Sequence, residues 1–195
     1  IVNGLVGSEM CIRDRSYPYN NGMRTVGDEF PTFELQGVNP SNELVSVSVE
    51  GSYTPHKHDW SVIYFYPKDF TFICPTEISA MDILVDEANV IGISGDNEFC
   101  KLAWKNDNEL IGNIRHPLAA DCGLYLSEEL GIVNHEEGVC YRATFIIDKN
   151  RVIQHVSVNA LDTGRNADEV LRTLQALKAG GLTGCSWSPE DDFVA

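Results

Sequence analysis

An apolar run at residues 61–67, SVIYFYP, limits what this chain can fold into more than any other stretch. Its apolar residues follow one another without polar alternation, which is typical of a central strand buried on both faces of a sheet. Apolar residues recur at helical spacing over 78–88, and NVIGISGD at 89–96 reads as another buried strand. A half-exposed strand is expected at 43–50 and a polar-faced helix at 97–109. The strand–helix–strand order requires a right-handed crossover, so the two buried strands are expected to be parallel.

The last third of the chain has a different pattern. Residues 143–148 and 152–158 are β-rich runs on either side of a short KNR turn, which predicts an antiparallel hairpin. Residues 166–181 carry acidic residues in a first helical turn and glycines at the end, as a helix does. A βαβ half followed by a ββα half is the thioredoxin arrangement. We therefore expect an α/β, thioredoxin-like fold with a central mixed sheet flanked by helices.

The length of 195 residues suits one domain with short appendages. We expect this domain to span 23–181 and to be followed by a tail, 182–195, that lacks periodicity. Residues 1–22 show no pattern that continues into the domain. They are similar to a translated sequencing-adapter remnant, and a disordered natural N-terminus is the alternative.

Charge and hydropathy argue against two classes of partner. The chain has 14 basic and 29 acidic side chains, a formal net charge of −15, and no cluster of Lys and Arg. Nucleic acid and anionic membrane surfaces are therefore not expected as partners. No apolar run reaches the roughly 18 residues that a membrane-spanning helix needs.

The cysteines are spaced too widely for a local metal or redox pair. Six occur in the sequence, none in a CxxC pair, so neither a zinc ribbon nor a thioredoxin-type dithiol is expected. Sparse cysteines without a visible export signal favour a reducing, cytoplasmic setting. The histidines of HKH at 56–58 lack a third ligand, and no flavin, nicotinamide or haem motif is present. We predict no metal and no cofactor, so electrons must arrive through thiols.

Cys74 stands where the strand at 61–67 gives way to the helical segment. Unpaired N–H groups and the helix dipole favour an anion at such a corner. A free thiol with a pKa near ~8.5 is only about 3% thiolate at neutral pH, whereas a pKa of about 6 gives roughly 90%. The local field therefore decides whether Cys74 is a nucleophile or a buried structural cysteine, the commoner fate of cysteines.

The neighbours of Cys74 favour the nucleophile. Pro67, Thr71 and Cys74 are spaced Pro-x-x-x-Thr-x-x-Cys, which resembles the active-site motif of the peroxiredoxins. FYPKDFTFICPTE is similar to the typical 2-Cys branch, which includes the alkyl hydroperoxide reductase C (AhpC/TSA) family, and above all to its mycobacterial type. Three further stretches resemble the same family: GVCYRATFIID, GRNADEVLRTLQALK and CSW. The resemblance therefore extends from about residue 24 to residue 187.

The resemblance implies a thiol-dependent peroxidase acting on hydrogen peroxide and alkyl hydroperoxides. Cys74 would be the peroxidatic thiolate and become a sulfenic acid. Thr71 would align thiolate and peroxide, with simple packing as the alternative, and Pro67 would shield the pocket. Arg142, at the head of the strand ATFIID, would hold the thiolate and stabilise the departing oxygen.

Two further charged residues each have two possible roles under this resemblance. Glu77 would orient the guanidinium of Arg142, or it is a solvated carboxylate at the helix start. Arg165 would be a supporting cation or a member of an ion pair at the start of the last helix. Neither assignment follows from the motif alone.

Cys185 in the tail would resolve the sulfenic acid by forming an intersubunit disulfide in a homodimer, and dimers would join into a ring. The mycobacterial type has Cys-x-Cys here, whereas this chain has Thr183 at the upstream position, so an idle tail thiol is the alternative. Cys100, Cys122 and Cys140 are expected to be passengers, although Cys140 lies near the pocket motif. The reductant would be thioredoxin, an AhpF-like flavoprotein or an AhpD-like protein. A peroxide sensor or redox relay and an oligomeric holdase chaperone are the competing functions.

Overall fold

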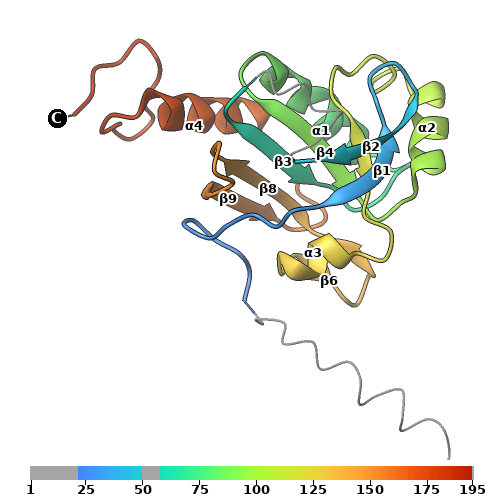
Figure 1. The fold of residues 1–195 in the computed structure, drawn as a ribbon. Helices are drawn as coiled ribbons and strands as arrows, with labels where there is room; N and C mark the ends of the chain where they lie inside the picture. Colours follow the sequence, from blue (N-terminus) through green and yellow to red (C-terminus); the bar gives the residue numbers. More distant parts are fainter. Residues whose placement is uncertain (1–21, 50–57, 195) are drawn as a thin grey trace, which may run out of the picture.

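A mixed sheet organises the computed structural model, which describes residues 22–49 and 58–194. In these residues the sheet has seven strands in the order β2-β1-β5-β4-β3-β8-β9, and β6 and β7 form a separate pair (Figure 1). The strands are β1 (Glu34–Val38), β2 (Leu44–Ser48), β3 (Ser61–Phe65), β4 (Asn89–Ser94), β5 (Leu118–Ala120), β6 (Val133–Asn134), β7 (Val139–Cys140), β8 (Arg142–Ile147) and β9 (Ile153–Asn159). The helices are α1 (Cys74–Met81), the 3₁₀ helix η1 (Asp82–Asp86), α2 (Glu98–Asp107), α3 (Tyr125–Glu129) and α4 (Ala167–Ala179).

β3 lies in the interior of this sheet and is buried on both faces, as its apolar run predicts. It pairs with β4 in parallel and with β8 in antiparallel orientation. Val62 and Tyr64 pack into the core on the face covered by α1 and α4, and Ile63 and Phe65 pack into the core on the other face. The β3–α1–β4 crossover and the β8–β9 hairpin are both present. The thioredoxin-like prediction is confirmed.

The strand expected at 43–50 is β2, but the sheet also contains two strands that the sequence pattern did not reveal, β1 and β5. β5 pairs with β4 in parallel and with β1 in antiparallel orientation, so β1 and β2 extend the sheet beyond the thioredoxin core. β5 has three residues, too few to show a two-residue period. In β1, Gly37 lies so close to β5 that a Cβ there would sit 2.5 Å from the Leu118 carbonyl oxygen. A glycine inside a strand pattern thus marks a close backbone approach.

The helix expected from Pro75 through the apolar positions at 78–88 begins one residue earlier and is shorter. α1 begins at Cys74, so Pro75 occupies the second helical position, where its missing N–H is still tolerated. After Met81 the chain continues as the 3₁₀ helix η1. Its first residue, Asp82, accepts a hydrogen bond from the Arg115 backbone N–H and contacts the Nδ1 of His116. Within the described residues, no helix is both long and apolar enough to cross a bilayer.

The C-terminal segment contains neither helix nor strand over 182–194, yet it folds back on itself beyond α4 (Figure 1). The Trp187 ring, in a residue that is 6% exposed, stacks on Phe193 with centroids 6.0 Å apart. Arg172 of α4 donates to the Trp187 carbonyl at 3.1 Å. The lack of periodicity therefore reflects irregular packing. The N-terminal segment that resembles an adapter remnant lies outside the described residues, apart from Gly22.

Candidate active site

Cys74 is the first residue of α1 and is 1% exposed. The eight residues between β3 and α1, 66–73, bring it to this position, and the buried Pro67 lies near their start. Ile73, the N-cap of α1, offers no side-chain hydrogen bond to the first turn. In that turn Pro75 has no N–H, and the N–H groups of Thr76 and Glu77 donate to the Ile73 carbonyl at 3.1 and 3.2 Å. All five cysteines in the described part of the chain are free thiols.

Arg142, the first residue of β8, supplies the cation beside this sulfur. Its Nη1 lies 3.3 Å from the Cys74 Sγ and donates at 2.6 Å to the Glu77 Oε2. Its Nε and Nη2 both donate to the Leu161 carbonyl, at 2.8 and 2.6 Å. Although burial opposes the charge, the Cys74 sulfur and Glu77 raise the pKa of Arg142 above its ordinary value. A fixed positive charge therefore touches the sulfur in a dry pocket.

Glu77 lies between two guanidinium groups. Its side chain is 2% exposed; Oε2 accepts from Arg142, and Oε1 accepts from the Arg165 backbone N–H at 3.0 Å. The Arg165 Nε is 3.3 Å from the same Oε1, and its Nη2 donates to the Phe65 carbonyl. Glu77 is thus not the solvated carboxylate that the sequence left open. Arg165 is a buried ion-pair partner of Glu77, and burial lowers the pKa of Arg165 below its ordinary value.

Thr71 lies on the loop ahead of Cys74 and is partly exposed. Its hydroxyl donates to the Lys68 carbonyl at 2.9 Å. A hydroxyl has one proton to donate and two lone pairs to accept with. In this conformation Thr71 can therefore accept a hydrogen bond from a peroxide O–H, while its own proton is already engaged.

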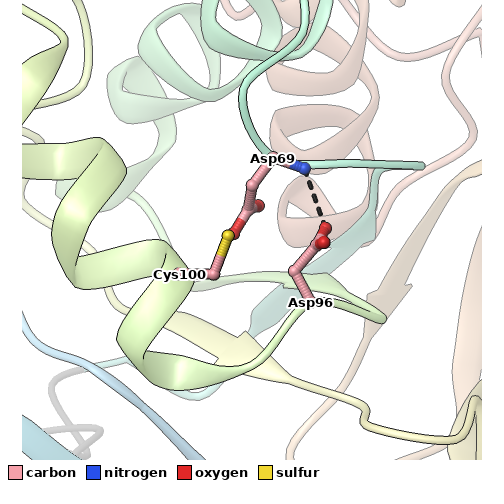
Figure 2. A group of neighbouring side chains, drawn as sticks. All are labelled: Asp69, Asp96 and Cys100. Carbon is pink, nitrogen blue, oxygen red and sulfur yellow. Dashed lines mark hydrogen bonds between the residues drawn. The ribbon is translucent and has the colours of Figure 1, made fainter.

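The loop that carries Thr71 is anchored by residues that the motif does not contain. The Asp69 backbone N–H donates to the Asp96 Oδ2 at 2.8 Å (Figure 2). Lys101 of α2 is fully buried; its Nζ lies 3.5 Å from the Asp69 Oδ1 and also donates to Ser94. Lys101 stands three residues before the buried Trp104, and this helical spacing could have placed it on the inner face of α2.

The same region contains a group of potential metal ligands, Asp69, Asp96 and Cys100, whose ligand atoms all lie within 4.8 Å of one another (Figure 2). Burial raises the pKa of Asp69 and of Cys100. Because the Lys101 ammonium already lies beside Asp69 as its counter-ion, we assign no metal to this group. Of HKH, only His58 belongs to the described residues, and its Nε2 contacts the Val85 carbonyl at 3.2 Å.

The other thiols differ in environment. Cys140 is fully buried and donates to the Tyr66 carbonyl at 3.1 Å, and burial raises its pKa to about 12. Burial also raises the pKa of the Cys122 thiol. Cys185 is exposed on the segment beyond α4, with its Sγ 3.8 Å from the Ser186 hydroxyl.

A lone cysteine held by an arginine at the first turn of a helix, on a thioredoxin-like sheet and without a CxxC partner, defines a thiol enzyme that uses a single attacking sulfur. Comparison with known proteins gives the family. The AhpC/TSA family model matches residues 26–156, more than half of the chain. The chain therefore belongs to the AhpC/TSA family, and it is a thiol-dependent peroxidase of the peroxiredoxin class.

Individual relatives agree. A Bacillus subtilis protein named as a peroxiredoxin, YkuU, is 43% identical over 174 residues, which cover 85% of this chain and 96% of that protein. Alkyl hydroperoxide reductase C of Mycobacterium tuberculosis is 38% identical over 86% of this chain and 91% of its own length. The reduced 2-Cys peroxiredoxin of Plasmodium vivax superposes with a TM-score of 0.78 at 33% identity, covering 87% of this chain and 92% of that one. The AhpC structure from M. tuberculosis superposes with a TM-score of 0.74 at 36% identity, covering 86% of this chain and 100% of that one.

Proposed function

We propose that this chain reduces hydrogen peroxide and alkyl hydroperoxides with Cys74 as the peroxidatic residue. The observation that carries the proposal is the 3.3 Å contact between the Arg142 Nη1 and the Cys74 Sγ, with both residues at most 5% exposed. A charge-assisted contact in a site that excludes water favours the thiolate, the form that attacks. The substrate class is supported by the relatives that are named alkyl hydroperoxide reductase C.

The first half-reaction oxidises the sulfur. The Cys74 thiolate attacks the terminal peroxide oxygen; an S–O bond forms, the O–O bond breaks, and its electron pair leaves with the second oxygen. That oxygen takes a proton and departs as water or an alcohol. Arg142, oriented by Glu77 and with Arg165 supporting the pair, stabilises the developing charge. Thr71 holds the peroxide in line by accepting its O–H, and Pro67 limits access of water.

The second half-reaction restores the sulfur. The thiol of Cys185 of the partner subunit attacks the sulfenic sulfur of Cys74, an S–S bond forms, and the hydroxyl leaves as water. The exposed, free thiol of Cys185 supports this role, which makes 182–195 the resolving segment of a peroxidase domain at 23–181. The unit is then a homodimer within a ring of dimers. A cytoplasmic thiol reductant, whether thioredoxin, an AhpF-like flavoprotein or an AhpD-like protein, reduces the disulfide.

Stopped-flow peroxide consumption tests the proposal with wild type, Cys74→Ser, Cys185→Ser and the matched control Cys122→Ser, another exposed thiol. Cys74→Ser is expected to abolish the fast reaction with peroxide. Cys185→Ser is expected to retain the first turnover but to lose recycling by a thiol reductant. Cys122→Ser should behave as wild type.

Non-reducing electrophoresis after one equivalent of peroxide identifies the resolving residue. A disulfide-linked dimer should form in wild type and Cys122→Ser and be absent from the other two variants. A dimer band that persists in Cys185→Ser would assign resolution to another thiol. Full peroxide consumption by Cys74→Ser would refute the function itself.

A further inference from the structure

A buried chain of polar contacts outside the peroxiredoxin motif approaches the site on the face of the sheet that α1 and α4 cover. His116 is 1% exposed, and its Nε2 lies 2.7 Å from the hydroxyl of the fully buried Tyr64. Its Nδ1 lies 2.9 Å from the Asp82 Oδ1 at the start of η1. The imidazole therefore bridges a carboxylate and a phenol inside the core, 34 and 52 residues away from it in sequence.

The charge state of Asp82 fixes the direction of these hydrogen bonds. Burial opposes the carboxylate, yet hydrogen bonds from His116 and from the Arg115 backbone and side chain lower the pKa of Asp82 to about 2. A charged carboxylate can only accept, so the Nδ1 of His116 carries the proton and its Nε2 accepts from the Tyr64 O–H. Burial, aided by Lys105 and Arg115, lowers the pKa of His116 against the pull of Asp82, which keeps the imidazole neutral.

The sheet makes room for this hydrogen bond. Gly92 of β4 pairs directly with Tyr64 of β3, and a Cβ at Gly92 would lie 2.5 Å from the Tyr64 hydroxyl oxygen. Any larger residue would displace the phenol from His116. The glycine, the tyrosine and the histidine are thus matched to one another.

Tyr64 connects this chain to the active site through its ring. The Arg165 guanidinium carbon lies 5.2 Å from the ring centroid, within cation–π range. Burial raises the pKa of Tyr64 well above its ordinary value, so the ring remains a neutral phenol. Among residues 22–49 and 58–194, the buried Arg165 Nε and Nη1 have no hydrogen-bond partner. The face of the Tyr64 ring, the Phe65 carbonyl and the charge of Glu77 therefore hold this guanidinium in place.

We propose that Asp82, His116 and Tyr64 are positioning residues for the peroxidatic site. Asp82 and His116 fix the Tyr64 ring against the Arg165 guanidinium. Arg165 then holds Glu77, and Glu77 orients Arg142 toward the Cys74 sulfur. The hydrogen bond that the Tyr64 hydroxyl donates to His116 also increases the electron density of the ring, which strengthens the attraction of the ring for the guanidinium. The proposal rests on the proposed role of Cys74, and none of the three residues touches the reacting atoms.

The test compares His116→Leu, Tyr64→Phe, their double variant and His116→Gln, whose amide can accept from Tyr64 and donate to Asp82. His155→Leu, a half-buried histidine on β9 outside this chain of contacts, is the matched control. Two quantities are measured for each: the pKa of Cys74, from the pH dependence of its alkylation followed by peptide mass spectrometry, and the peroxide rate constant at pH 7.

His116→Leu and Tyr64→Phe are expected to raise the measured Cys74 pKa and to lower the rate roughly threefold to tenfold. The double variant should be no worse than the poorer single variant, because the two residues act as one unit. His116→Gln should recover most of the loss, and His155→Leu should match wild type. A merely structural role would lower the melting temperature without moving the Cys74 pKa.

An unchanged Cys74 pKa in folded Tyr64→Phe would overturn the proposal, even if His116→Leu failed to fold. So would additive losses in the double variant. The alkylation readout needs no turnover, so it separates this proposal from the peroxidase function. If wild type failed to consume peroxide but Tyr64→Phe still changed the Cys74 pKa, the positioning role would be supported and the peroxidase function would be refuted.

Discussion

At the scale of single residues, the arginine beside the sulfur has the most specific geometry. The Arg142 guanidinium contacts Cys74, Glu77 and the Leu161 carbonyl at the same time. A lysine ammonium keeps the charge but cannot span these three partners. We expect Arg142→Lys to lower the peroxide rate constant by about 10²–10³-fold, as the loss of a preorganised donor does.

Stopped-flow measurement at pH 7 checks this expectation, with Arg172→Lys as the control. Arg172 pairs with Glu169 on the exposed face of α4 at helical spacing. Its replacement by lysine should change the rate less than twofold. A rate for Arg142→Lys close to that of Arg172→Lys would show that charge alone suffices.

Cys140 illustrates the opposite case, a thiol that burial makes inert. Its pKa is raised to about 12, so the folded state holds the proton more tightly than the unfolded chain does. The resulting stability is fully present below pH ~8.5–9, the range of an ordinary thiol, and is lost as the pH rises toward 12. Urea midpoints measured at pH 8, 10 and 11 should therefore fall less steeply for Cys140→Ala than for wild type.

The constant offset from the cavity in Cys140→Ala does not affect this slope, since it is the same at each pH. Cys185→Ala, an exposed thiol, should retain the slope of wild type. We also expect Cys140→Ala to retain the wild-type peroxide rate, as suits a passenger. A tenfold loss of rate would place Cys140 in the mechanism.

At the scale of elements, the loop between β3 and α1 shows what sequence can and cannot provide. The spacing of Pro67, Thr71 and Cys74 on one short connection predicts a site there, because it resembles the peroxiredoxin motif. The anchors of that loop, Asp96 and Lys101, come from β4–α2 and carry no motif of their own. The spacing of Lys101 from Trp104 could place Lys101 on the inner face of α2, but only tertiary packing brings Lys101 and Asp96 to the loop. The same holds for His116, whose partners lie on two other elements.

The ion pair between Lys101 and Asp69 is expected to contribute strongly to stability. Lys101→Met leaves the Asp69 carboxylate buried without its cation, which costs about 3–5 kcal/mol of unfolding free energy at pH 7. Because the pKa of an unpaired buried carboxylate is raised, the neutral acid becomes the favoured form as the pH falls. The deficit should therefore shrink between pH 7 and pH 4.

Lys178→Met provides the matched control on α4. Its partner Glu87 and Lys178 itself are each about a third exposed, and such pairs contribute roughly 0–1 kcal/mol. Urea denaturation of both variants separates the two cases. Equal losses in Lys101→Met and Lys178→Met would mean that the buried pair adds no more than a surface pair.

At the scale of the whole molecule, the thioredoxin core and β2 were predictable from the sequence, whereas β1 and β5, which connect them in the sheet, were not. The parallel β3–β4 pair and the β8–β9 hairpin follow from hydrophobic periodicity and turn residues. β1 and β5 are too short or too interrupted by glycine to show a period, and the irregular packing around Trp187 has none. In each case long-range contacts, which local pattern does not encode, decide the structure.

The largest rearrangement that we predict follows from the burial of Cys74 and the exposure of Cys185. Disulfide formation requires the two sulfurs to come within ~2.05 Å and their Cα atoms within roughly 7 Å. Since Cys74 is 1% exposed beneath its loop, the first turn of α1 must leave the pocket. Ile73 provides no side-chain cap, so opening this turn breaks no side-chain capping hydrogen bond.

We expect amide hydrogen exchange at residues 74–81 and 182–194 to accelerate in the disulfide-linked dimer relative to the reduced protein. Exchange in β4 should not change, and peroxide should not accelerate exchange in Cys185→Ser. Equal protection of residues 74–81 in both redox states would mean that the sulfurs meet without opening the helix, which the burial of Cys74 does not allow.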